Sequence, residues 1–448
     1  MNDALESVVI VGGGPAGMRA AEAFVAHGVR PLLIDEAARP GGQGYRTPPA
    51  SIGLDMPRLL GRQHARHARL HAEFAALHAQ IDHHPETLVF AIEPGRLHVV
   101  ENGRARVVAY RTLIIASGAT DRVMPVPGWT LPGVFSLGGA QLALKDQGCL
   151  IGPRVVFVGS SPLLALAAAQ YRRMGAEVVA VCDETPFVAK ARAAPALARA
   201  PGTFALGVSL LAELKRAGVA LRFGVTPLQI EGERRVEAIM LRDAHGRETR
   251  LACDAVALGH GLKPETQLAD LAGASFAFDA ITRLWTPVID ADGRAGSGLY
   301  LAGDGAAIGG AEAAQASGAL AALAALKDAG TAVDERRMER LRANDARLRA
   351  FQRGIARAFV WPAARAATLP DDTVLCRCEN VSVGEVRAAV ASGQIPPEVN
   401  RAKAITRCGM GRCQGRFCGP ALQEVVAAQA AVSVAEVGRL RGQAPVKP

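Results

Sequence analysis

Near the start of the chain, the apolar residues are first consecutive, then recur at helical spacing, and then are consecutive again. Residues 7–35 read SVVIVGGGPAGMRAAEAFVAHGVRPLLID. The run Val8–Val11 is typical of a buried parallel strand, the apolar residues after the glycines recur at helical spacing, and a second apolar run covers Pro31–Ile34. Gly28 ends the helical pattern. The stretch therefore predicts a strand-helix-strand unit.

The same order of strand, turn, helix and strand recurs over residues 154–184, RVVFVGSSPLLALAAAQYRRMGAEVVAVCDE. Two such units predict an α/β protein with two nucleotide-binding halves. Three further segments each read as a buried strand that runs into a turn containing glycine. They are Arg111–Ala119, Asp254–Pro264 and Gly298–Leu326.

The pattern changes again in the last quarter of the chain. Residues 334–359 are charged and helical, and Trp361-Pro362 ends them, which indicates a bridging helix and a domain boundary near residue 370. Ser382 and Glu385 form a capping-box signature for a helix that Gly393 closes. Pro420 is placed to begin another helix.

Composition and charge narrow the class of protein. A chain of 448 residues predicts about two to three domains, and 50% hydrophobic residues with 48 glycines fit a globular α/β enzyme. The net charge is +9, but lysine supplies only 7 of the 51 basic residues and the arginines are scattered. We therefore expect no nucleic-acid partner, although a basic docking face for an acidic partner stays open.

Targeting signals are missing from the sequence. The first residues, MNDALESVVIVGGG, lack the basic region of a signal peptide, and no run of 18 apolar residues occurs. We expect a cytoplasmic protein, in which thiols stay reduced. Five of the eight cysteines fall within residues 376–418, and in that compartment they indicate metal ligands before disulfides.

The first turn, GGGPAG over residues 12–17, matches the dinucleotide-binding pattern GxGxxG in its required place between strand and helix. Gly12 permits the tight turn, Gly14 lets the backbone approach a pyrophosphate, and Gly17 lets helix and strand lie close together. The diphosphate can then sit at the helix N-terminus. Asp35, at the end of the second strand, can accept hydrogen bonds from a ribose.

PGGQGYR (Pro40–Arg46), TLIIASGA and LYLAGD (Leu299–Asp304) resemble three further signatures of FAD-binding flavoproteins with two dinucleotide domains, the glutathione-reductase-like enzymes. The resemblance implies that FAD occupies the first site and that Asp304 reaches its ribityl and phosphate region. It implies cofactor contacts from Gly12, Gly14, Pro15, Ala16, Gly17, Asp35, Glu36, Gly42, Gln43, Arg46, Gly118, Gly303 and Asp304.

The chain departs from that family in two ways. The redox-active cysteine pair is absent, and Cys149, Cys182 and Cys253 are expected to be small buried hydrophobes. In the second turn, Ser161 and Leu164 replace two glycines, which favours a vestigial or repurposed NAD(P)H domain. Asp183 and Glu184 could still suit the ribose of NADH, so nucleotide binding stays an alternative.

The C-terminal cysteines offer five thiols to a site that needs four. Cys376 and Cys378 form a CxC pair, and Cys408, Cys413 and Cys418 follow at equal spacing. Four thiolates suit zinc or an iron-sulfur cluster. The CxC pair, the glycine-rich loop and two predicted helix N-termini nearby favour an anionic [2Fe-2S] cluster.

LCRCENVSVGEVRAAV and TRCGMGRCQGRFCGP resemble the BFD-like [2Fe-2S] domain of bacterioferritin-associated ferredoxin. Its attachment to this type of flavoprotein resembles the large A-type subunits of opine oxidases and the equivalent subunits of hydrogen cyanide synthase and proline or hydroxyproline dehydrogenases. The resemblance implies that Cys376, Cys378, Cys413 and Cys418 are the ligands. Cys408 is the remaining thiol, and equal spacing leaves open whether it replaces Cys413.

We expect a domain order that follows these signatures. It is an FAD domain over 1–118 and 290–330, a degenerate NAD(P)-binding-like domain over 119–289, a helical linker over 331–370 and the BFD-like domain over 371–448.

Six of the ten histidines fall within residues 64–84, and four of them share one helical face. A helix edge at the core boundary or a subunit contact is the favoured interpretation, with a three-histidine metal site as the alternative.

The leading functional hypothesis is an electron-transferring subunit that carries FAD and a [2Fe-2S] cluster. The family resemblance implies a smaller FAD-containing partner subunit that oxidises the C–N bond of an opine, proline or hydroxyproline, and a hetero-oligomer of the two. The sequence shows no general base or nucleophile constellation, in line with chemistry carried by cofactors. The electron acceptor is unidentified, and any membrane contact would be peripheral and made through it.

Two alternatives stay open. One is a stand-alone NAD(P)H-dependent reductase of an iron-sulfur protein, and the other is a non-catalytic assembly partner.

Overall fold

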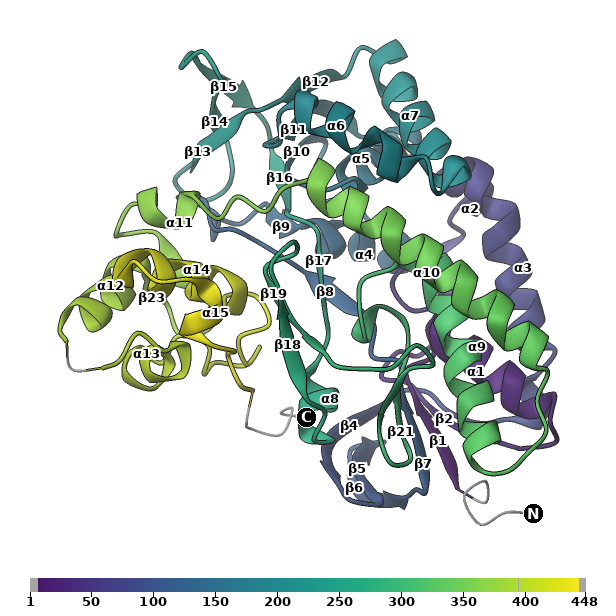
Figure 1. Cartoon of the computed structure of the whole chain (residues 1–448). Coiled ribbons are helices and arrows are strands. Elements are labelled where there is room, and N and C mark those ends of the chain that lie inside the picture. Colours follow the sequence, from purple (N-terminus) through teal and green to yellow (C-terminus); the bar gives the residue numbers. More distant parts are fainter. Residues whose placement is uncertain (1–6, 394, 443–448) are drawn as a thin grey trace.

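The computed structural model describes residues 7–393 and 395–442, and it contains two largely parallel sheets and a small C-terminal helical domain. In Figure 1 the C-terminal domain, in yellow, lies to one side of the hairpin β18–β19, while the N-terminal strand β1 lies in the lower part of the molecule. The long helix α10 runs across the front from α9 toward α6.

The first sheet has six strands in the order β20-β21-β7-β1-β2-β3. Strand β1 is buried along its whole length and pairs in parallel with β2 and β7. Helix α1 begins directly after the turn, with Pro15 in its first position. The elements are β1 (Val8–Val11), α1 (Pro15–Val25), β2 (Leu32–Ile34), β3 (Asp82–His84), β7 (Thr112–Ile115), β20 (Arg294–Gly296), β21 (Leu299–Leu301) and α9 (Gly310–Asp328).

Helices α1 and α9 lie against each other over the first sheet. A Cβ added at Gly318 of α9 would stand 2.0 Å from the carbonyl oxygen of Ala16, so only glycine permits this approach. The two helices and the sheet enclose one apolar core that includes Ile10, Phe24 and Leu323. The cofactor turns that precede both helices are thereby held next to one another.

Two insertions interrupt the first sheet along the chain, one between β2 and β3 and the other between β3 and β7. One contains short helices and the other is an antiparallel meander. They are η2 (Ala50–Ile52), α2 (Met56–Leu60), η3 (Gly61–Gln63), α3 (His64–Ala75) and η4 (His78–Gln80), and then β4 (Thr87–Glu93), β5 (Arg96–Glu101) and β6 (Arg104–Ala109).

The second sheet has five parallel strands in the order β12-β11-β10-β16-β9. A separate three-stranded antiparallel meander, β13-β14-β15, lies between β12 and β16 along the chain. The elements are β9 (Val134–Ser136), α4 (Leu137–Gln147), β10 (Arg154–Gly159), α5 (Leu163–Arg173), β11 (Glu177–Asp183), α6 (Phe187–Leu197), α7 (Pro201–Arg216), β12 (Ala220–Phe223), β13 (Thr226–Glu231), β14 (Ala238–Arg242), β15 (Glu248–Ala252) and β16 (Ala255–Gly259).

The two sheets are joined by a pair of short antiparallel strands. Thr120 of β8 faces Lys263 of β17 across this pair. The chain then forms a short helix and a hairpin before it returns to the first sheet. These elements are β8 (Ala119–Asp121), β17 (Leu262–Pro264), α8 (Gln267–Leu271), β18 (Phe276–Asp279), β19 (Leu284–Pro287) and η5 (Gly303–Gly305).

The bridging helix and the capped helix predicted from the sequence are present. Asp334 caps α10 by accepting from the backbone N–H of Arg337. Ser382 and Glu385 form the reciprocal capping box of α12. The elements are α10 (Glu335–Ala358), α11 (Arg365–Thr368), β22 (Val374–Cys376), β23 (Val381–Ser382), α12 (Val383–Ala391), α13 (Val399–Thr406), α14 (Gly419–Ala430) and α15 (Val434–Val437).

Within the described residues, no helix combines the length and apolar character needed to cross a membrane.

Candidate functional site

Four glycine-containing turns, far apart in sequence, meet at one place. A Cβ added at Gly42 would lie 3.1 Å from the Cα of Gly14, which joins the first and second predicted signatures. A Cβ at Gly305 would lie 2.6 Å from Ser117 Oγ and 3.2 Å from the nitrogen of Gly118, which joins the other two. The structure therefore gathers the segments that the sequence assigned to one cofactor.

The first turn is built for close backbone approach. Gly12 has a φ of +108°, and a Cβ there would stand 2.3 Å from the carbonyl oxygen of Ala116. A Cβ at Gly17 would stand 1.8 Å from the carbonyl oxygen of Gly12. Substitution at either position would push helix α1 away from β1, and the N–H groups of its first turn, from Ala16 onward, would lose their aim at a diphosphate. Pro15, which has no N–H, sets the direction in which that turn begins.

Of the two acidic residues at the end of β2, Asp35 is used inside the fold. Its Oδ2 accepts from the nitrogen of Gly13 at 3.0 Å and its Oδ1 from that of Ala37 at 3.1 Å. Burial raises the pKa of Asp35 to about 6, against these two hydrogen bonds. The side chain of Glu36 is exposed and has no hydrogen bond or ion pair among the described residues. Asp35 thus shapes the turn, whereas neither carboxylate oxygen of Glu36 is engaged by the described residues.

Asp304 organises the turn before α9. Its Oδ1 accepts from the nitrogens of Gly309 and Gly310, at 2.8 and 2.9 Å. The nitrogen of Gly303 donates to Ser317 Oγ at 2.9 Å, which fixes the same turn from the other side. Burial raises the pKa of Asp304. The second carboxylate oxygen accepts no hydrogen bond from the described part of the chain and remains for the cofactor.

The Pro40–Arg46 loop is fastened by two histidines of α3. His71 Nε2 lies 2.7 Å from the carbonyl oxygen of Tyr45, and His67 Nε2 lies 3.4 Å from that of Arg46. Two of the four histidines on the predicted face, His67 and His71, therefore lie at the core boundary and also support this loop. Gln43 at the loop tip is exposed.

Two cations near this loop have nitrogen atoms without protein partners, although Arg46 Nη1 also lies 3.5 Å from Asp146 Oδ2. Arg46 Nε is buried without a hydrogen bond among the described residues. Lys145 of α4 is 4% exposed and its ammonium makes no hydrogen bond or ion pair there, and burial lowers its pKa to about 8. Buried polar groups are nearly always paired, so these two fit a bound anionic or polar cofactor. Lys145 could not be predicted from the sequence, because one lysine in a helix gives no signal of burial.

The C-terminal thiols form two groups. The Sγ atoms of Cys376, Cys408 and Cys418 lie within 4.8 Å of one another, and all three residues are buried. Cys378 lies in hydrogen-bonding contact with Cys413 nearer the surface. Each group thus contains one member of the CxC pair and at least one thiol from the later loop.

This arrangement fits a cluster of two irons, each of which needs two thiolates. Cys376 with Cys418 and Cys378 with Cys413 would supply one pair to each iron. Hydrogen bonds from Cys408 and then Cys418 lower the pKa of Cys376, so the buried group readily holds a thiolate. Cys408 is fully buried beside Cys376 and Cys418. Its Sγ lies as close to theirs as the Sγ atom of a cluster ligand would.

Glycines let the cysteine loop close. A Cβ added at Gly411 would stand 2.2 Å from the Cβ of Cys378. Cys418 is the N-cap of α14, so the partly positive helix terminus faces the thiols as the sequence predicted.

Glu265 connects the flavin turn to the cysteine loop. Its nitrogen donates to the carbonyl oxygen of Gly118 at 2.9 Å, and its carbonyl oxygen accepts from Ser117 Oγ at 2.7 Å. Its carboxylate accepts from Arg416 Nε at 2.8 Å. Lys263 is half-buried near Glu265, Arg416 and Cys413, and desolvation of its ammonium lowers its pKa. This junction could not be predicted from the sequence, because its members lie about 150 residues apart.

The cysteines outside the cluster are only partly as expected. Cys182 and Cys253 are buried, and burial raises the pKa of Cys182 to about 12 and that of Cys253 to about 11. Cys149 was expected to be buried but is exposed, because the loop after α4 carries it to the surface, where its Sγ contacts the carbonyl oxygen of Gln147.

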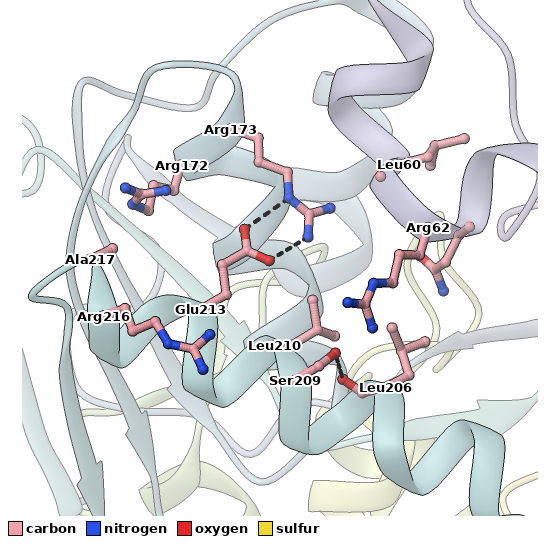
Figure 2. A pocket seen from close by; sticks show the side chains of 12 residues that line it. Leu60, Arg62, Arg172, Arg173, Leu206, Ser209, Leu210, Glu213, Arg216 and Ala217 are labelled. Atoms are coloured by element: carbon pink, nitrogen blue, oxygen red, sulfur yellow. Dashed lines mark hydrogen bonds and ion pairs between the residues drawn. The ribbon is translucent and has the colours of Figure 1, made fainter.

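A hollow of about 420 Å³ lies away from these sites, between α2, α5 and α7 (Figure 2). Glu213 accepts two hydrogen bonds from Arg173, at 2.9 and 2.6 Å, and Arg173 also donates to the carbonyl oxygen of Leu59. No residue predicted to bind a cofactor lines it. The ion pair therefore braces the α2 insertion against the second domain.

The glycine turns, the two sheets and the cysteine pairs together define an FAD-dependent oxidoreductase of the pyridine nucleotide-disulphide oxidoreductase class with an added iron-sulfur domain. The family model described as pyridine nucleotide-disulphide oxidoreductase matches residues 6–321, and the one described as BFD-like [2Fe-2S] binding domain matches residues 374–428. The chain belongs within this class to the family of opine oxidase A subunits and their hydrogen cyanide synthase equivalents.

Two relatives support that assignment, and one solved structure supports the fold. The chain is 36% identical over 464 residues to the A subunit of opine oxidase from Agrobacterium tumefaciens (strain Ach5), covering 98% of this chain and 90% of that relative. It is 35% identical over 422 residues to hydrogen cyanide synthase subunit HcnB of Pseudomonas protegens, covering 92% and 89%. The fold resembles the crystal structure of L-proline dehydrogenase from P. horikoshii, with a TM-score of 0.71 and 20% identity over 99% of this chain and 78% of that one.

The ligand set implied by the family resemblance, Cys376, Cys378, Cys413 and Cys418, predicts which cysteines hold iron. Cys413→Ala and Cys418→Ala should each lose the cluster, because either change leaves one iron with a single thiolate. Cys408→Ala should keep about two irons per chain. Iron and sulfide analysis, with the paramagnetic signal of the reduced protein, measures this directly. Loss of iron in Cys408→Ala with retention in Cys413→Ala would reverse the assignment.

Burial of Lys145 predicts a pH-dependent stability change. The folded pKa of about 8 lies below the ordinary 10.5, so the native state penalises the charged lysine at every pH below 8. Lys145→Met should therefore raise the free energy of unfolding of the flavin-free protein by up to about 3 kcal/mol at pH 7. The gain should shrink as pH rises from 8 toward 10.5.

Urea unfolding at pH 7 and pH 10 checks this, with the exposed Lys215→Met as the matched control. An equal effect of Lys145→Met at both pH values would show that charge burial is not its cause.

Proposed function

We propose that this chain is the electron-transferring subunit of a heteromeric dehydrogenase or oxidase that acts on the C–N bond of a secondary amino acid of the opine, proline or hydroxyproline type. A smaller FAD-containing partner would oxidise the substrate, and this chain would pass the electrons to an acceptor. The relatives are named as subunits of opine oxidase and hydrogen cyanide synthase, which supports a multi-subunit enzyme.

The observation that carries the proposal is the junction at Glu265. One residue contacts both the flavin turn at Gly118 and the cysteine loop at Arg416. A hollow of about 90 Å³ beside this junction is lined by both Glu265 and Arg416. Such a junction holds the flavin turn and the cysteine loop next to each other, which supports a relay between two redox centres.

The residues of the chain would act by positioning. FAD exchanges one or two electrons and a [2Fe-2S] cluster one at a time, so together they convert a two-electron oxidation into single-electron steps. The first turn of α1 would hold the diphosphate, and Glu36 the ribose. Lys145 and Arg46 would place positive charge beside the flavin, which stabilises negative charge gained on reduction.

The exposure of the cysteines would determine from which side of the cluster electrons pass to the acceptor. Cys378 is exposed and Cys413 partly so, whereas Cys376 and Cys418 are buried. Electrons would therefore leave from the Cys378 side. The exposed Arg377 and Arg412 flank that side and suit an acceptor with an acidic docking face.

Neither alternative function gains a supporting observation. An assembly partner would need neither the cofactor turns nor the junction, and a stand-alone reductase would need a second nucleotide site with free carboxylates, whereas Asp183 and Glu184 are both engaged.

Reduction of this chain should depend on its partner. In an anaerobic dye-reduction screen, proline, hydroxyproline, opines and glycine should leave the flavin of the isolated chain oxidised. One of them should bleach it rapidly in the complex co-purified from the native cell. The isolated chain reconstituted with FAD and iron serves as the control.

Substrate reduction of the isolated chain would contradict the proposal, because the oxidation site would then lie in this subunit. Purified protein that contains neither flavin nor cluster would favour the assembly role instead.

A further inference from the structure

The second nucleotide crevice should open where β10 and β11 end. In this type of domain the diphosphate passes over the turn after the first strand, and acidic residues at the end of the second strand bind the adenine ribose. Here the turn is Gly159–Leu164 and the acidic residues are Asp183 and Glu184.

The carboxylate of Asp183 already has hydrogen-bonding and ionic partners within the protein. Its Oδ2 lies 2.8 Å from Lys190 Nζ, and its Oδ1 accepts from the nitrogen of Thr185 at 2.8 Å. The side chain is only 5% exposed. A ribose hydroxyl would have to displace a buried ion pair to reach it.

Glu184 is engaged more tightly. Arg365 Nη1 donates to both of its oxygens, at 3.0 and 3.1 Å, and His260 Nε2 lies 2.7 Å from its Oε1. The carboxylate is 7% exposed and the imidazole 0%. Burial alone would raise the pKa of Glu184, but Arg365 and then His260 lower it. Arg365 lies beyond helix α10, so a distant segment supplies the countercharge.

The segment that contains Arg365 begins at the end of α10, and three consecutive residues of it contact the edge of the crevice. The carbonyl oxygen of Ala358 accepts from Lys190 Nζ at 3.0 Å, and the same ammonium lies 4.1 Å above the ring of Phe359. The nitrogen of Val360 donates to Thr185 Oγ1 at 3.0 Å. Thr185 Oγ1 in turn lies 2.9 Å from Ser160 Oγ in the turn itself.

Trp361 continues this contact toward the cysteine domain. Its ring meets that of His260 edge to face at 5.8 Å, and the guanidinium of Arg122 stacks on it at 3.7 Å. Its Nε1 donates to Glu424 Oε1, in α14, at 2.9 Å. Arg365 Nη2 also donates to the carbonyl oxygen of Pro125 at 2.7 Å. The segment thus ties the crevice to the helix that Cys418 caps.

The turn below the segment no longer accommodates a diphosphate. Ser160 and Ser161 are each 1% exposed. Leu164 occupies the position that corresponds to Gly17 of the first turn, where a Cβ would clash with the backbone at 1.8 Å. Helix α5 must therefore stand further from its turn than α1 does.

We propose that residues 358–365 are an internal occupant of the second nucleotide crevice, which excludes NAD(P)H and anchors the cysteine domain to the nucleotide domain. Asp183, Glu184 and the turn hydroxyls then serve as a socket for Lys190, Val360 and Arg365. Beyond the proposed function, this segment would exclude NADH and NADPH as electron donors, whichever substrate the partner oxidises.

Hydrogen exchange of the full cofactor-loaded chain tests the proposal. In the wild type, residues 183–190 and 358–366 should be protected, and neither NADH nor NADPH should change their exchange or bleach the flavin. Arg365→Ala should speed exchange of both segments by about tenfold, because it leaves Glu184 without its cation. Limited proteolysis should then cut within 359–370.

Arg357→Ala is the matched control, since the side chain of Arg357, in the last turn of α10, is exposed and has no hydrogen bond or ion pair among the described residues. It should exchange as the wild type does. If Arg365→Ala does not fold, Lys190→Met removes the other countercharge and should open the same two segments. Protection of residues 159–190 by NADH in the wild type, or wild-type exchange in Arg365→Ala and Lys190→Met, would overturn the proposal.

Discussion

The contact of Glu265 with both redox regions is the constraint on which the rest of the structure depends. Its backbone is hydrogen-bonded to the turn at Ser117 and Gly118, and its carboxylate to Arg416 of the cysteine loop. The pairing of β17 with β8 fixes this residue where the two sheets join. The side chains of Arg416 and Glu265 are 27% and 13% exposed, so the ion pair is largely sheltered from solvent screening.

The two nucleotide-type domains have diverged around this junction. In the first domain, glycines at positions 12, 14 and 17 keep the turn open to a diphosphate. In the second, Ser160 joins a buried hydrogen-bond chain through Thr185 to Val360. One domain is thus shaped to hold a cofactor, and the other carries contacts that hold the cysteine domain in place. In the proposed function, the two domains together would give the relay a fixed geometry without a second nucleotide.

Local patterns were enough to predict much of this from the sequence. The runs of apolar residues, the glycine turns and the capping box at Ser382 each depend on neighbouring residues and are present in the structure. What could not be predicted depends on contacts between distant segments. Asp35 Oδ2 accepts from the nitrogen of Gly13, His71 contacts the carbonyl oxygen of Tyr45, and Lys145 is buried without a partner among the described residues. Sequence spacing carries no information on such burial or pairing.

The central claim is that flavin and cluster stand close enough for direct electron exchange across Glu265. Magnetic resonance of the purified chain, reduced so that flavin semiquinone and reduced cluster coexist, measures this most directly. A junction of this geometry predicts a semiquinone whose relaxation is strongly accelerated, or whose signal is split, by the neighbouring paramagnetic cluster. A slowly relaxing, unsplit radical that behaves as it does in the cluster-free Cys418→Ala protein would contradict the account.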